Sequence, residues 1–174
     1  MYDLAVRNIK MNNLEADISI LNQDIKEYKD IVKYIRDNVT SSGNVDVIVC
    51  NPPYKEVGTG VINENNVKYI ARHEEKCTLE DIFLSSSKLL KTKGKLYLVH
   101  KPDRLADLIC LARKYNLEVK EIIMLQPTKS KKPSIVFLEY VKDGSKGVNI
   151  LPNILEYDED GNYTDKIKEI YRME

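Results

Sequence analysis

A six-residue apolar run that stops at two prolines constrains this chain more than any other feature. The run is Val45-Asp46-Val47-Ile48-Val49-Cys50, and Asn51-Pro52-Pro53-Tyr54 follows it directly. β-branched residues favour strands, and a nearly continuous apolar strand is typical of a parallel sheet covered on both faces. Proline has no backbone N–H, so it cannot continue the ladder of a central strand. The sequence therefore predicts a buried parallel strand that opens abruptly into a stiff loop.

Helical and extended patterns alternate on both sides of this strand. Apolar residues recur at helical spacing in residues 2–12, 28–35, 79–90 and 105–112. Thr78 and Asp81 have the spacing of a capping box at the start of the third of these helices. Further strand-like runs occupy residues 16–21, 95–100, 118–126 and 134–141. This order predicts a doubly wound α/β sheet whose last two strands form an antiparallel hairpin.

The composition fits one globular domain and bounds the class of protein. The chain has 174 residues, of which 43% are hydrophobic and 31% are charged, so it can bury a sizeable core. Its 27 basic and 27 acidic residues cancel, and nucleic-acid binding would therefore depend on local patches. No apolar run reaches the roughly 20 residues of a membrane helix, and the first residues lack a signal-peptide pattern. We expect a cytoplasmic protein with reduced, buried thiols and no metal site.

The loop Asn51-Pro52-Pro53-Tyr54 has the residues that methylation of a planar amine requires. Active sites of doubly wound sheets lie at the carboxyl ends of the strands, which is where this loop begins. The lone pair of a ring-conjugated amine is delocalised, so the amine is a poor nucleophile. The Asn51 amide oxygen and the Pro52 carbonyl would accept its two N–H bonds and favour the pyramidal, reactive form, while Tyr54 would stack on the ring. The alternative is a simple strand-terminating turn.

At this point the chain resembles the Rossmann-like amino methyltransferases, whose motif is Asn/Asp-Pro-Pro-Tyr/Phe. Within that group it is most similar to the bacterial valine-tRNA adenine-N6 methyltransferase family. Three further segments match that family: Ala71-Arg72-His73-Glu74, His100-Lys101-Pro102-Asp103-Arg104-Leu105, and the tail around Tyr157-Asp158-Glu159-Asp160-Gly161-Asn162-Tyr163-Thr164. The resemblance implies a class I methyltransferase sheet with S-adenosylmethionine as methyl donor. It also implies a tRNA adenine that is flipped out of its stack to reach the site.

The resemblance also implies roles for individual residues. Asn51, Pro52, Pro53 and Tyr54 match the catalytic motif, and Asn51 would also border the cofactor. Asp24 matches the acid that binds the cofactor adenine, with a helix N-cap as the equally good alternative. For Arg72 and Glu74 the resemblance suggests contact with the substrate, and the alternative is an ion pair between the two side chains.

The fold that the resemblance implies is incomplete at its amino end. Such a sheet should open with a strand, a glycine-rich turn and a helix, and a second strand should end in an acid for the cofactor ribose. Neither is present in the sequence, so about 60 residues, two strand–helix units of roughly 30 each, are missing from the pattern. We expect residues 1–174 to form one incomplete methyltransferase domain that is inactive alone. The unpaired strand edges should make the chain self-associate or re-pair its strands.

Two groups of lysines are candidates for phosphate contact. Lys129, Lys131 and Lys132 lie in the turn between the last two strands. This turn meets the active-site edge if the first of those strands runs parallel to the catalytic one, and RNA contact and plain solvation are then equally good interpretations. Residues 91–95 carry three more lysines, which should lie at the opposite edge.

Two other functions remain open at this stage. A glutamine carboxamide presents the same planar NH₂, so the loop would also suit protein-glutamine N5 methylation. A noncatalytic RNA-binding remnant is the alternative outside the enzymes, because the segment that should bind the cofactor is missing.

Overall fold

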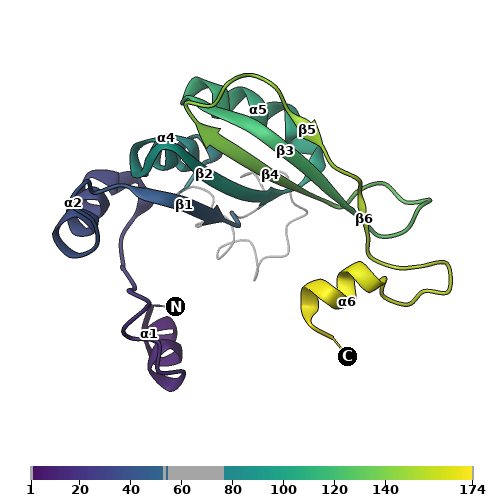
Figure 1. The fold of residues 1–174 in the computed structure, drawn as a ribbon, viewed down its shortest axis with the longest axis horizontal. Helices are drawn as coiled ribbons and strands as arrows, with labels where there is room; N and C mark the ends of the chain where they lie inside the picture. The colour runs from purple at the N-terminus through teal and green to yellow at the C-terminus, as the bar shows by residue number, and fades with distance from the viewer. Residues whose placement is uncertain (1, 53, 55–76, 174) are drawn as a thin grey trace, which may run out of the picture.

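The computed structural model describes residues 2–52, 54 and 77–173. Its helices and 3-10 turns are α1 (Tyr2–Met11), η1 (Ile25–Glu27), α2 (Tyr28–Asn38), α4 (Leu79–Leu89), η2 (Pro102–Arg104), α5 (Leu105–Lys114) and α6 (Asp165–Tyr171). Its strands are β1 (Val45–Cys50), β2 (Leu90–His100), β3 (Leu117–Gln126), β4 (Ile135–Lys142), β5 (Asn149–Ile150) and β6 (Ile154–Leu155). Figure 1 shows these elements with α1 standing away from the sheet.

The strands form a single sheet in the order β1-β2-β4-β3-β5, and β6 also pairs with β3. β1 and β2 are parallel, with Cys50 opposite Leu98, whereas β4 is antiparallel to both of its neighbours. β3 therefore runs in the same direction as β1 and β2. The carboxyl ends of these three strands meet at one edge of the sheet, which we call the carboxyl edge. The predicted antiparallel hairpin is confirmed.

Helices cover only one face of this sheet in the described part of the chain. Alternate residues of β2 and β4, among them Leu96, Leu98 and Leu138, are buried against α4 and α5, together with Phe83 and Leu108. The residues between them point to the other face and are half-buried or exposed. In Figure 1 α4 and α5 lie behind the strands. The core is thus a two-layer structure, helix against sheet.

The expected coverage of β1 on both faces is wrong. Ile48 and Cys50 pack against the core, but Val47 and Val49 on the opposite face are 51% and 77% exposed. β1 is also the first strand of the sheet order, so its outer edge has no strand partner among the described residues. The apolar side chains are present as predicted, and the layer that would cover them is not in the described structure.

The predicted strand at residues 16–21 does not form. The segment contains a turn followed by extended chain without ladder partners. A strand needs a neighbour for its backbone hydrogen bonds, and the sheet as described ends at β1. The predicted helix before it does form as α1, which has no buried residue. The sheet keeps its expected order at the open edge, without the re-pairing that was considered.

Candidate active site

Asn51 and Tyr54 lie at the carboxyl edge of the sheet. Asn51 follows the last residue of β1 and is exposed, while Pro52 is buried and Tyr54 is half-buried. β2 ends at His100, two residues beyond the partner of Cys50, so its end lies beside the loop. Asn51 is exposed, so its side chain is not turned into the interior. The proposed chemistry requires this accessible position.

A short hydrogen bond joins the two polar residues of the motif. The Tyr54 hydroxyl donates to Asn51 Oδ1 across 2.6 Å. This bond fixes the orientation of the amide, because only the oxygen can accept it. An amide oxygen has two lone pairs, so Asn51 Oδ1 can accept a second hydrogen, from an amine, without losing the first bond. The sequence did not indicate this role for the Tyr54 hydroxyl.

The end of β2 supports the Tyr54 ring from two sides. His100 lies edge-on to it, with the ring centroids 5.3 Å apart, and is only 2% exposed. Burial lowers the pKa of His100, which keeps the ring neutral near pH 7. Lys101 Nζ lies 5.6 Å from the centroid of the Tyr54 ring, and Lys101 itself is exposed. Tyr54 is therefore held by a buried neutral ring and an exposed cation.

Asp24 is the N-cap of η1, which was the alternative interpretation of this residue. Its Oδ1 accepts the Lys26 N–H at 3.0 Å, and its side chain is 44% exposed. Ser85 on α4 anchors the turn, because its hydroxyl donates to the Ile25 carbonyl at 2.8 Å. The second oxygen of Asp24, Oδ2, forms an ion pair with Lys26 Nζ at 3.6 Å, and the cofactor role of Asp24 stays a prediction.

Asp24 also lies near Cys77, which precedes α4. Its charge contributes to the raised pKa of Cys77, whose main cause is partial burial. Cys77 in turn contributes to the raised pKa of Cys50, about 11, for which burial is again the main cause. Asp24 thus lies near Cys77, and Cys77 lies near Cys50, the residue before Asn51. All three thiols are free, as expected, but Cys50 and Cys77 are only half-buried and Cys110 is exposed, so the prediction of buried thiols is wrong for Cys110 and is met only in part by the other two.

The turn between β3 and β4 reaches the carboxyl edge, as predicted. Gln126 at the end of β3 holds it, because its Nε2 donates to the Thr128 and Lys129 carbonyls at 2.9 and 3.0 Å. Lys129 Nζ forms an ion pair with Glu159 at 2.9 Å. Lys131 and Lys132 are exposed, and no described carboxylate lies within ion-pair distance of them. Lys129 therefore has an acidic partner, whereas Lys131 and Lys132 have none among the described residues. The sequence alone did not indicate this difference.

The second lysine group lies at the opposite edge, as expected. Lys91 pairs with Asp46 at 2.8 Å, and the Lys93 ammonium donates to the Asp143 carbonyl at 2.6 Å. These contacts indicate surface positions.

Three of the predicted site residues, Pro53, Arg72 and Glu74, lie outside the described residues.

We call the turn between β3 and β4, which carries Lys129, Lys131 and Lys132, the basic turn. A cavity of about 680 Å³ lies beside it. Tyr157 forms part of its lining, and its ring stacks on that of Tyr163 with the centroids 5.1 Å apart. Lys129 and Glu159 also line this cavity. Among the residues that the structure describes there is no acidic, histidine or cysteine cluster suited to a metal, and no helix long and apolar enough to cross a membrane.

No protein-family model matches the chain. Among curated proteins, it is 27% identical over 143 residues to the tRNA1(Val) (adenine(37)-N6)-methyltransferase of Porphyromonas gingivalis strain ATCC 33277. The protein of that name from strain W83 matches equally well. The resemblance to this methyltransferase family is confirmed. The alignment covers 78% of this chain and 55% of the relative, so the chain spans about half the length of the relatives that it matches.

Solved structures confirm the fold. A protein described as a predicted O-methyltransferase from Agrobacterium tumefaciens superposes with a TM-score of 0.68 at 14% identity, covering 98% of this chain and 72% of that one. A protein described as the modification subunit of a type I restriction enzyme from Vibrio vulnificus gives a TM-score of 0.53 at 15% identity, covering 98% and 38%. The chain therefore has the α/β methyltransferase sheet that was expected, with its antiparallel strand.

Proposed function

We propose that this chain provides the amine-methylating site of an S-adenosylmethionine-dependent methyltransferase that modifies adenine N6 in tRNA. The observation that carries the proposal is the position of the Asn51 amide. Its oxygen lies at the carboxyl edge of the sheet, fixed by the Tyr54 hydroxyl at 2.6 Å and exposed to solvent. The printed name of the Porphyromonas gingivalis relatives supports adenine N6 in tRNA as the target.

The described residues can prepare an adenine for this reaction. Asn51 Oδ1 has a free lone pair for one hydrogen of the N6 amine, which favours the form whose nitrogen lone pair can attack. Tyr54 offers a ring for stacking, and base–aromatic stacking contributes about 1–3 kcal/mol in nucleic-acid complexes. A base can reach this ring only when it has left its own stack. The chain therefore positions the amine, and a strong general base is not required.

S-adenosylmethionine would supply the methyl group, and the described residues fit part of that molecule. Asp24 has a partly exposed carboxylate, paired with Lys26 at 3.6 Å, that can still accept from the adenine amine, and Asn51 lies at the carboxyl edge of the sheet. We propose that the 174-residue chain alone binds the cofactor too weakly for turnover. We also propose that it works in the cytoplasm and self-associates through the open edge of β1, where Val47 and Val49 are exposed.

Mass spectrometry of tRNA nucleosides from the source cells tests the function. Replacing Asn51 with Ala in the chromosomal gene should abolish one N6-methyladenosine in tRNA. Asn38→Ala is the matched control, because within the described part of the chain the Asn38 amide bonds only to the Tyr34 carbonyl of its own helix. If the N51A strain retains full tRNA methylation, the proposal is wrong. If tRNA is unchanged and a methylated glutamine disappears from a protein instead, the substrate is a protein.

A further inference from the structure

We propose that Lys101 binds a phosphate of the RNA strand beside the target base, and that its ammonium leaves the Tyr54 ring when the base stacks there. The inference rests on the proposed function. It concerns a residue that the sequence singled out only as part of a matching segment, His100-Lys101-Pro102-Asp103-Arg104-Leu105.

The position of Lys101 is the first reason. His100 contacts the Tyr54 ring from the interior, whereas Lys101 is exposed and contacts it from the solvent side. A base that stacks on the ring face that lies under the ammonium therefore meets the ammonium first. Stacked rings lie closer together than the 5.6 Å between Nζ and the Tyr54 centroid, so the base and the ammonium cannot share that face. The ammonium has to move as the base enters.

The electrostatic environment of Lys101 is the second reason. Its Nζ reaches the Ser134 carbonyl at 3.5 Å, at the end of the basic turn. No carboxylate in residues 2–52, 54 or 77–173 forms an ion pair with Lys101, whereas Lys129 is paired with Glu159. Lys131 and Lys132 of the turn also lack an acidic partner there. Lys101 thus lies beside the Asn51–Tyr54 pair, and Lys131 and Lys132 lie farther along the same edge of the sheet, in the turn between β3 and β4.

A phosphate can replace the contact that Lys101 loses. An exposed cation–π contact contributes little, and an ammonium is a compact donor well suited to phosphate oxygens. Each phosphate contact to single-stranded nucleic acid adds about 0.7 to the slope of log affinity against log salt. Entry of the base is therefore coupled to binding of its phosphate, and this coupling should contribute about 0.7 to the salt slope.

The test measures binding of a fluorescent RNA hairpin with 2-aminopurine at the target position, using the whole chain. Lys101→Ala should weaken binding about fivefold at 0.1 M salt and reduce the salt slope by about 0.7. The 2-aminopurine signal at saturation should be unchanged, because the Tyr54 ring remains. Lys101→Arg should restore both affinity and slope. Tyr54→Ala should do the opposite of Lys101→Ala, changing the signal at saturation and leaving the slope.

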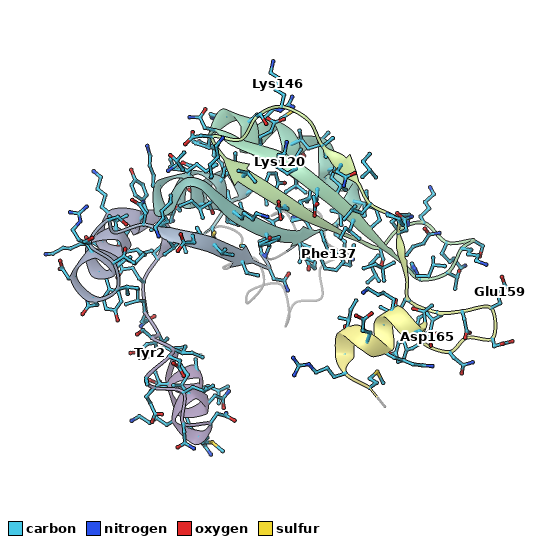
Figure 2. The ribbon with its side chains drawn as sticks, in the orientation of Figure 1. Tyr2, Lys120, Phe137, Lys146, Glu159 and Asp165 are labelled. Atoms are coloured by element: carbon cyan, nitrogen blue, oxygen red, sulfur yellow. The ribbon has the colours of Figure 1, made fainter. Side chains whose placement is uncertain are left out.

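Lys146→Ala is the matched control, since Lys146 lies at the far end of the sheet, away from Glu159 and the basic turn (Figure 2). A Lys101→Ala slope equal to that of wild type and Lys146→Ala would overturn the inference and leave the proposed function intact. A wild-type chain that binds no RNA at 50 mM salt would overturn the inference as well as the assignment of RNA as substrate. Loss of methylation in the N51A strain remains a separate test of the chemistry.

Discussion

Replacing Tyr140 with Phe should stabilise this protein. Tyr140 lies on β4 in the centre of the sheet and is fully buried. Its hydroxyl has no hydrogen-bond partner among the described residues, and burial strongly raises its pKa. The ring packs edge-on against Phe83 with the centroids 5.4 Å apart, and the substitution preserves that contact. Only the hydroxyl changes between the two proteins.

The size of the effect follows from the cost of an unsatisfied buried group. Such a group costs about 1–3 kcal/mol, and the small void left by one oxygen offsets part of the gain. We therefore expect Tyr140→Phe to raise the free energy of unfolding by about 1 kcal/mol, which corresponds to about 2–4 °C in Tm for a chain of this size. Urea unfolding followed by circular dichroism should show a higher midpoint with an unchanged m value.

Tyr115→Phe provides a control of opposite sign. The Tyr115 hydroxyl donates to Glu80 Oε1 at 2.6 Å, so its loss should lower the free energy of unfolding. If Tyr140→Phe destabilises the protein as much as Tyr115→Phe does, the Tyr140 hydroxyl is hydrogen-bonded in solution and the reasoning is refuted.

Three further predictions follow from the structure. The lowered pKa of His100 means that unfolding takes up a proton below about pH 6.5, so stability should fall between pH 7 and pH 5, and His100→Asn should show a shallower fall in urea titrations at both pH values. Val49→Lys should reduce self-association in sedimentation velocity, whereas Val148→Lys, also on the surface, should not; equal sedimentation of both variants with wild type would exclude the β1 edge as the contact. Thr78→Ala should cost about 1 kcal/mol in thermal unfolding, because it removes the capping box with Asp81, and an unchanged Tm would contradict this.

The strands that find partners within the chain were predictable from sequence. Apolar and polar residues alternate in much of β3 and β4, which indicates one covered face, and a turn of suitable length joins the two strands. The segment 16–21 has strand-like residues too, but a strand is defined by pairing, and no neighbour is available in the described structure. The prediction that Val47 and Val49 are covered failed for a similar reason. Their apolar character indicates a covering layer, and a local pattern cannot show whether that layer is present.

The candidate site was also predictable from the sequence only in part. The position of Asn51 at the carboxyl edge follows from the strand that precedes it and from parallel topology. The contacts of Tyr54 with Asn51, His100 and Lys101 depend on side-chain orientations at the ends of two strands, which no spacing in the sequence encodes. The pairing of Lys129 with Glu159 likewise joins residues 30 apart through the fold.

The connectivity of the sheet has a kinetic consequence. β3 and β4 are joined by a short turn, so they can pair early, whereas β1 reaches β2 only after residues 51–89 have closed a long crossover. Among the described strands β1 has one neighbour where β4 has two, so β1 should also open more readily, and its backbone amides should exchange with solvent faster than those of β4. The residue proposed to direct methylation is thus attached to a strand that pairs late and opens readily, so any contact that stabilises β1 would also stabilise the site.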